Sequence, residues 1–210
     1  MNAQVRQQGR PPVADVESLR AAALPLIERH GYEQVSMSAL AGELGVSVRT
    51  LHRYFPAKAD IVWGGIDGSI SALTGSLQEA DQGGSLREAV ALAAERVLQR
   101  NVEDLEMMRA RIRLIARTPT LRSARSTTFE RWREELIRFT AYRLGEAPTA
   151  LTPIVLGSAL HETVSQALSW WSLADEGTQP AACVRFALEG LDTLLAAPPT
   201  LQPSGPSSMR

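Results

Sequence analysis

The chain has 210 residues, a formal net charge of −1 at pH 7 and one cysteine, Cys183. This length can bury a substantial core in one or two domains. The nearly balanced charge excludes a protein that binds any polyanion through an overall positive surface, so basic residues must act by their position. A single cysteine excludes an internal disulfide and a thiolate zinc cluster, and three histidines give little support to a metal site.

The amino-terminal part begins with a polar segment that has no hydrophobic periodicity. Residues 1–13 are therefore expected to form a disordered arm. A helix is predicted from residue 14 or 15 to His30, and Gly31 is expected to end it. Pro25 lies inside this helix and should kink it or remove one hydrogen bond.

A short helix is predicted next, with Ser36 as its N-cap. Its apolar residues recur at i, i+3, i+4 and i+7, which gives a single packing stripe made of Met37, Leu40, Ala41 and Leu44. Gly45 follows directly, and a residue without Cβ can enter the left-handed conformation of a tight helix end at little cost. The chain is therefore expected to turn sharply at this glycine.

A second short helix should begin after Ser47, which can cap it, and should end at Phe55 before Pro56. Leu51 and Phe55 lie on one face and are predicted to pack inward. The remaining side chains have no core to join, and they are Val48, Arg49, Thr50, His52, Arg53 and Tyr54. Two short helices around a glycine corner indicate a DNA-binding helix-turn-helix; an ordinary helical hairpin with a solvated face is the alternative.

Three stretches between Leu19 and Ile61 resemble the amino-terminal pattern of the TetR family of transcriptional regulators. They are Arg29-His30-Gly31-Tyr32, Gly45-Val46-Ser47 and the run Thr50–Lys58. The resemblance implies a helix-turn-helix domain over 14–60 and a helical ligand-binding and dimerisation domain over 61–197. The run Arg49–Pro56 and the later Trp63-Gly64 also resemble the mycofactocin-system regulators, which respond to acyl-CoA.

The second short helix should place its first turn at the base edges of the major groove. Arg49 can donate two hydrogen bonds to guanine, while the resemblance implies that Lys58 contacts a phosphate. His52 departs from the tyrosine most common in the family, and a phosphate contact by this histidine would strengthen as the pH fell. The predicted DNA-binding residues are Ser36, Ser47, Val48, Arg49, Thr50, His52, Arg53, Tyr54 and Lys58.

The remainder of the chain predicts further helices and no strand, so the expected fold is all-α with about nine helices. The helix from Ala59 to about Ala80 contains Gly64, Gly65 and Gly68, which should make it pliable. We expect this helix to move when a ligand binds. The other predicted helices cover about 86–101, 105–118, 120–144, 151–174 and 180–197, and 198–210 is expected to be a disordered tail.

Large adaptable side chains on the middle helices suggest a pocket for an apolar or amphipathic effector, although such side chains also fill ordinary cores. The predicted pocket residues are Trp63, Ile66, Met108, Ile112, Trp132, Phe139, His161 and Trp170. If the effector is an acyl-CoA, the arginine run at 109, 111, 113 and 117 could hold its phosphates; a solvated helix face is the alternative.

The last two helices carry more apolar residues than one subunit should need to cover, and the resemblance implies that they form a four-helix homodimer interface. The predicted interface residues are Leu156, Leu160, Val164, Leu168, Phe186 and Leu191; the alternative is that they are core.

Catalysis has little support from the sequence. His161-Glu162 begins like a zinc-protease helix, but Ser165 stands where the second histidine must lie. We therefore expect no enzyme activity, no cofactor and no metal, and a cytoplasmic location with no membrane partner. The predicted function is a ligand-responsive regulator, most simply a repressor, that binds a palindromic DNA operator as a homodimer. The alternative is a helical small-molecule-binding protein that has lost DNA binding.

Overall fold

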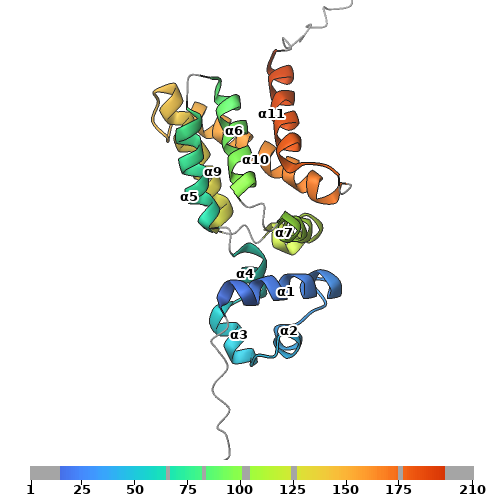
Figure 1. Cartoon of the computed structure of the whole chain (residues 1–210). Coiled ribbons are helices and arrows are strands. Elements are labelled where there is room, and N and C mark those ends of the chain that lie inside the picture. Colours follow the sequence, from blue (N-terminus) through green and yellow to red (C-terminus); the bar gives the residue numbers. More distant parts are fainter. Residues whose placement is uncertain are drawn as a thin grey trace, which may run out of the picture.

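The structure is a computed structural model that describes residues 15–64, 67–81, 84–100, 105–123, 127–174 and 177–196. All regular structure in these residues is helical, as predicted (Figure 1). The helices are α1 (Val16–His30), α2 (Met37–Glu43), α3 (Val48–Tyr54), α4 (Lys58–Trp63), α5 (Asp67–Ala80), α6 (Leu86–Arg100), α7 (Leu105–Arg117), α8 (Pro119–Ser123), α9 (Thr127–Leu144), α10 (Leu151–Leu173) and α11 (Pro180–Ala196).

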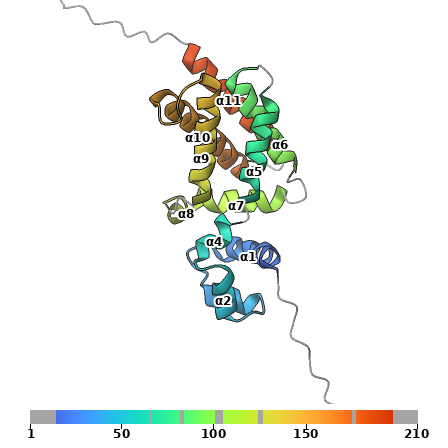
Figure 2. The same cartoon turned by 90° about the vertical axis from the view of Figure 1, so that its left-hand side faces the viewer.

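Two separate hydrophobic cores organise these helices. The first lies among α1 to α4, and α7 and α8 each add one fully or nearly buried leucine, Leu114 and Leu121. The second lies among α5, α6, α9, α10 and α11. Figures 1 and 2 both show α7 between the bundle and the small unit of α1 to α4. We call α1 to α4 the recognition unit and α5 to α11 the bundle.

Local capping chemistry sets the ends of the first helices as the sequence predicts. The carboxylate of Asp15 accepts a hydrogen bond from the Ser18 amide at 3.3 Å, and the hydroxyl of Ser36 accepts from the Ala39 amide at 3.1 Å. Gly45 has a φ of +67°, which is the left-handed conformation expected of it. Pro25 is accommodated inside α1, which continues to His30.

The predicted single helix over 59–80 is wrong. The helix begins at Lys58 and ends at Trp63, Gly64 is extended with a ψ of 170°, and a new helix begins at Asp67. Gly64 is a weak helix former, and the buried guanidinium of Arg20 fills the space where a Cβ on this residue would lie. The pocket residue Ile66 lies outside the described residues.

The predicted helix over 120–144 is also divided, into α8 and α9. Leu121 of α8 is fully buried in the first core, whereas Leu136 and Phe139 of α9 are buried in the second. One straight helix cannot serve both cores. The described residues contain eleven helices, of which nine have seven residues or more, in line with the expected number of about nine. The expected arm at 1–13 and tail at 198–210 lie outside those residues.

No helix of the described segments is both long and apolar enough to cross a bilayer.

The predicted boundary between residues 60 and 61 falls inside α4, whose residues Ile61 and Val62 are buried in the first core. The chain therefore leaves the recognition unit after α4, at Gly64.

Candidate DNA-binding interface and ligand cavity

The recognition unit holds α3 by its inward face. Leu51 and Phe55 are both fully buried, as the sequence predicts. Ser47 caps the helix by accepting a hydrogen bond from the Thr50 amide at 3.0 Å. With one face buried and its amino end capped, α3 presents its other face to solvent in a fixed orientation.

The solvent face of α3 contains the side chains that were predicted to meet DNA. Val48 is 38% exposed, and Arg49, His52 and Arg53 are exposed. Within the described part of the chain no group pairs with Arg49, whose five donors are therefore available to an acceptor outside the subunit. Ser36 is exposed at the amino end of α2 and its hydroxyl caps that helix.

Four of the predicted contact residues are held by local hydrogen bonds. The hydroxyls of Thr50 and Ser47 lie 2.8 Å apart. Arg53 donates to the hydroxyl of Tyr54 at 3.0 Å, and its guanidinium lies 4.8 Å from the centre of that ring. These contacts order the side chains before any DNA is present, which reduces the entropy lost on binding.

His52 lies 3.3 Å from the Pro56 carbonyl through its Nδ1 atom. The carbonyl can only accept, so Nδ1 carries the proton in this contact. In a neutral imidazole the other nitrogen, Nε2, is then an acceptor and cannot donate to a phosphate. A phosphate contact by His52 consequently requires the doubly protonated ring.

Lys58 is partly buried at the start of α4. Its ammonium donates to the backbone carbonyls of Tyr32 and Val35, the latter at 2.7 Å, and lies 4.4 Å from the centre of the Tyr32 ring. Two of its three donors are thus used within the subunit. Burial, with smaller contributions from Glu33 and Asp60, raises the pKa of the Tyr32 hydroxyl, so the ring beneath the ammonium stays neutral.

An apolar cavity lies in the second core, among α5, α6, α9, α10 and α11. Its volume is only about 30 Å³. Trp132 and His161, both predicted pocket residues, line it together with aliphatic side chains. His161 is 3% exposed and its ring stacks edge-on against Phe129, with the two centres 4.3 Å apart.

A chain of aromatic rings connects this cavity to the recognition unit. The ring of Phe129, which contacts His161, also lies edge-on to Trp63 of α4 at 6.2 Å. The indole N–H groups of Trp63 and Trp132 are buried without a hydrogen-bond partner in the described residues. Trp63 therefore lies at the junction of the two cores rather than on the cavity wall.

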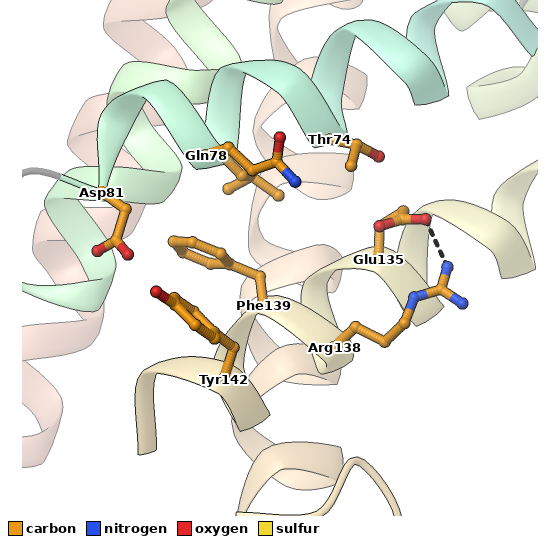
Figure 3. Close-up of a pocket in the computed structure, with 8 residues that line it drawn as sticks. Thr74, Gln78, Asp81, Glu135, Arg138, Phe139 and Tyr142 are labelled. Atoms are coloured by element: carbon orange, nitrogen blue, oxygen red, sulfur yellow. Dashed lines mark hydrogen bonds and ion pairs between the residues drawn. The ribbon is translucent and has the colours of Figure 1, made fainter. Parts of the chain in front are cut away.

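The other predicted pocket residues are dispersed. Phe139 does not line the apolar cavity but forms the floor of an open cleft of about 400 Å³ between α5 and α9 (Figure 3). Met108 packs on the second core, and Ile112 is half-buried on α7. Trp170 is 62% exposed, which contradicts its assignment to a pocket.

Two of the four arginines in the α7 run, Arg109 and Arg113, are held by contacts within the subunit, whereas Arg117 is exposed. Arg109 is 3% exposed, and its guanidinium donates to the backbone carbonyls of Trp171 and Ala174 at the end of α10. Arg113 donates to the Ser172 carbonyl at 3.1 Å and to Glu28 of α1 at 2.8 Å. These arginines join α10 to α7 and α1, a role the sequence did not indicate.

The predicted dimer residues divide by burial. Leu160 and Val164 are each 7% exposed and belong to the second core, and Leu168 and Leu191 pack against that core. Leu160 and Val164 are therefore largely covered within the subunit, whereas Leu168 and Leu191 remain partly exposed. Leu156 is half-buried, and Phe186 is 79% exposed.

A different apolar stripe is exposed on the last two helices. Four apolar side chains on one side of α10 are each more than half exposed. They are Leu151, Val155, Trp170 and Leu173, which recur at helical spacing. Phe186 of α11 is also exposed, and we call these five residues the α10–α11 face. Side chains of this size are seldom left exposed in groups on a monomer.

Comparison with known proteins identifies the family. Residues 19–62 match the model of the bacterial regulatory proteins of the tetR family, and residues 84–196 match the model of the MftR C-terminal domain. The chain belongs to the TetR family. Its members are helix-turn-helix DNA-binding transcription regulators rather than enzymes, and this chain carries the MftR type of C-terminal domain.

Relatives of this chain support the same assignment. A mycofactocin biosynthesis transcriptional regulator, MftR, of Mycobacterium tuberculosis is 30% identical over 176 residues, which cover 82% of this chain and 88% of that protein.

Two solved structures share the fold at lower identity. FadR from Bacillus subtilis in complex with stearoyl-CoA has a TM-score of 0.60 and 20% identity, covering 84% of this chain and 97% of FadR. FadR from Thermus thermophilus in complex with lauroyl-CoA has a TM-score of 0.52 and 18% identity, covering 91% and 100%.

Proposed function

We propose that this TetR-family regulator is a repressor that binds a palindromic operator as a homodimer and is released by an amphipathic acyl thioester of the acyl-CoA class. The observation that carries the proposal is the solvent face of α3, where the exposed Arg49, which has no partner among the described residues, lies on a helix fixed by Ser47 and Leu51. In the proposed complex, Arg49 donates two hydrogen bonds to a guanine in each half-site.

Dimerisation is proposed to occur through the α10–α11 face. One helix-turn-helix contacts too little of the groove for selective binding, and two of them read half-sites about 34–36 Å apart or a multiple of that distance. Trp170 and Phe186 are the largest exposed side chains on this face. Phe186→Asp should therefore produce monomers in analytical ultracentrifugation, whereas the equivalent change at the exposed Leu92 of α6 should leave the dimer intact.

The effector class is inferred from the second core and from the solved relatives. The cavity wall is apolar apart from His161 and the Trp132 indole, so it suits a hydrocarbon chain with few polar groups. Both FadR structures contain a fatty acyl-CoA. Because drug-sized ligands occupy about 300–1,000 Å³, a cavity of about 30 Å³ must widen to admit an acyl chain.

This required opening supplies a mechanism for release. An acyl chain would bind only the widened bundle and so would shift the population toward it. The ring contacts from His161 through Phe129 to Trp63 would carry the change to α4, and hence to the recognition unit. A coupling of about 1–3 kcal/mol between effector and operator would be enough for regulation.

The decisive experiment selects bound duplexes from a randomised DNA pool with the purified protein, and then adds acyl-CoA of increasing chain length. Enrichment of an inverted repeat, followed by release on adding a long-chain acyl-CoA, is expected. No enrichment at low salt would favour the alternative, a ligand-binding protein that no longer reads DNA. Enrichment without release by any acyl-CoA would overturn the proposed effector alone.

The selected operator also allows the proposed roles of two residues to be separated. Arg49→Ala should relax base preference at one position of each half-site by about 1–3 kcal/mol. Lys58→Ala should weaken all sequences alike, because its remaining donor is proposed to contact a phosphate. Titrations against single-base operator variants at several salt concentrations would measure both. A uniform loss of affinity in both variants would contradict this division.

A further inference from the structure

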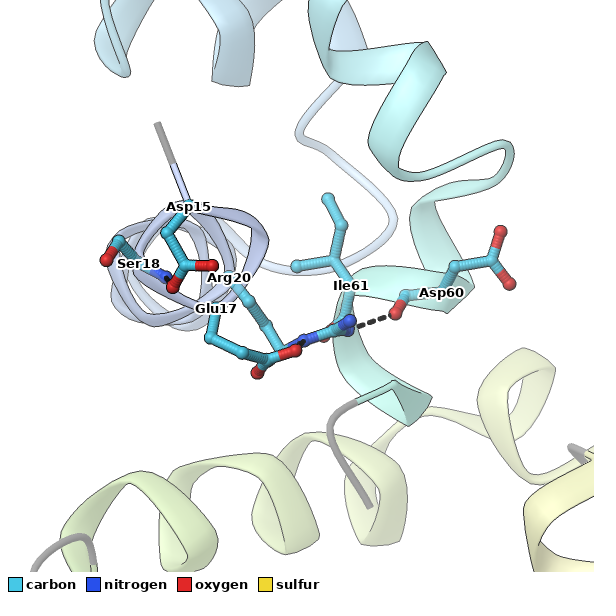
Figure 4. Close-up of polar contacts among 6 residues, drawn as sticks. All are labelled: Asp15, Glu17, Ser18, Arg20, Asp60 and Ile61. Atoms are coloured by element: carbon cyan, nitrogen blue, oxygen red, sulfur yellow. Dashed lines mark hydrogen bonds and ion pairs between the residues drawn. The ribbon is translucent and has the colours of Figure 1, made fainter. Parts of the chain in front are cut away.

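Arg20 on α1 is a buried charge that the sequence did not single out. The residue is 7% exposed in the first core, and a charge removed from water needs compensating partners. Its guanidinium donates to the Asp60 carbonyl and, at 3.0 Å, to the Ile61 carbonyl. Its Nε atom pairs with the Glu17 carboxylate at 3.2 Å, as Figure 4 shows.

The two carbonyls belong to the last turn of α4. The last four carbonyls of a helix have no partner within it, and a positive charge is favourable at this end. The Asp60 carbonyl also accepts from the Gly64 amide at 3.0 Å, but Arg20 is the donor that reaches Ile61. Arg20 thus caps α4 from a different helix.

The same side chain contacts the end of the recognition helix. The Arg20 guanidinium lies 4.9 Å from the centre of the Phe55 ring, and Phe55 is the residue that ends α3. Phe55 is itself fully buried. One side chain from α1 therefore contacts the end of α3 and the last turn of α4 at once.

Gly64 leaves the space that this arrangement needs. A Cβ built on residue 64 would overlap the guanidinium, lying 2.5 Å from the Arg20 Cζ atom. The φ of Gly64 is −72°, which any residue can adopt, so the glycine is needed for its missing side chain and not for its backbone. Adding one methyl group here would displace the guanidinium from its carbonyl partners.

We propose that Arg20 is a positioning residue that locks α3 and α4 to α1, and so fixes the distance between the two recognition helices of the dimer. The functional part of this inference rests on the proposed dimeric operator binding. The chain leaves the recognition unit through α4, which also packs on α7 of the bundle. If α4 tilts on α1, the recognition helix therefore changes its position relative to the bundle and its partner helix.

A double-mutant cycle tests the contact without DNA. Arg20→Ala and Gly64→Ala should each lower the melting temperature, because each removes the guanidinium from its partners. The double variant should melt no lower than Arg20→Ala alone, since the methyl group then has free space. If the losses of melting temperature in the two single variants simply added in the double variant, the proposed contact between Arg20 and residue 64 would be overturned. Arg29→Ala, an exposed arginine on the same helix, is the matched control and should change little.

The positioning role is tested on the selected operator and on versions with one or two base pairs added between its half-sites. The wild type should discriminate strongly against altered spacing, and Gly64→Ala should reduce that discrimination on the order of tenfold. Preference for bases within each half-site should be unchanged, because α3 itself is intact. A variant that was only less stable would keep the wild-type preference for half-site spacing, as well as the preference for bases, in the molecules that remain folded.

Three results would decide against the role. Unchanged spacing discrimination in both Gly64→Ala and Arg20→Ala would leave Arg20 as a structural residue only. Full retention of discrimination in Arg20→Lys would show that a positive charge suffices without the guanidinium, which holds Glu17 through Nε and both α4 carbonyls through Nη1, and would contradict the role of the guanidinium. If the wild type selects no paired half-sites, the proposed function fails and the positioning role with it, while the melting cycle still reports on the contact.

Discussion

The recognition unit and the bundle both have apolar cores, but they differ in what lies beside or within those cores. In the recognition unit, the long cationic side chains of Arg20 and Lys58 donate to backbone carbonyls of other segments. In the bundle, the cavity at the centre is lined by apolar side chains with His161 and Trp132 among them. Directional hydrogen bonds fix one geometry, whereas apolar packing can rearrange at smaller cost. The first region suits a rigid DNA reader, and the second suits a core that opens for a ligand.

The largest effect is expected from a substitution that leaves a cavity in the recognition unit. Leu51 is fully buried beneath α3, so Leu51→Ala should destabilise the unit by about 2–5 kcal/mol. DNA binding should be lost at temperatures where the bundle remains helical. Thermal melting followed by circular dichroism, together with operator binding, would measure this. Loss of both regions in one transition would show that they are not separable.

A cavity in the bundle should have a smaller and partly reversible effect. Val164 lines the apolar cavity, and Val164→Ala should cost about 2 kcal/mol in the absence of a ligand. Because the variant enlarges the cavity, acyl-CoA should restore more of its melting temperature than it adds to the wild type. Val35→Ala, at a similarly buried site of the recognition unit, is the control and should not be rescued.

The ion pair between the two regions should have a modest effect. Glu28 of α1 pairs with Arg113 of α7, and both side chains are about one-third exposed, so Glu28→Gln should cost roughly 0.5–1 kcal/mol. If this ion pair couples the recognition unit to the bundle, the melting transitions of the two regions should lie further apart in Glu28→Gln than in the wild type. Differential scanning calorimetry at low and high salt would resolve them. No salt dependence in the wild type would argue against the pair.

The smallest expected effect concerns the capping of α6. Glu88 accepts from the Ser85 amide at 2.8 Å and Ser85 accepts from the Glu88 amide at 3.2 Å, so the backbone donor lowers the pKa of Glu88. A lowered folded-state pKa gives stability that is present above the unfolded value and is lost as the pH falls through the folded value. Glu88→Gln should therefore melt below the wild type at neutral pH, and the two should converge in acid.

Much of the recognition unit follows from local sequence signals. Ser36, Ser47 and Gly45 act over three or four residues, and the structure has each cap and turn where it was expected. The apolar pattern also predicts that Leu51 and Phe55 are buried. Such features can be predicted because a cap or a stripe depends only on neighbours in the chain.

The errors all involve partners distant in sequence. The space beside Gly64, after the break at Trp63, is filled by Arg20, 44 residues from Gly64 along the chain by their numbers. A solvated face was one interpretation of the arginines of α7. The partners of Arg109 and Arg113, however, lie on α10 and α1. Leu160 and Val164 read as a dimer stripe, because periodicity shows which residues share a face but not which face meets the core.

By itself the sequence determined the all-helical class, the helix-turn-helix and the family, since helix periods and caps are encoded within each segment. Only the tertiary structure decided which buried arginines cap distant helices, where α4 ends, and which apolar face of the last two helices remains exposed. The physical reason is that a contact between an arginine and a distant helix end, or a cavity between helices, exists only once distant segments have been brought together.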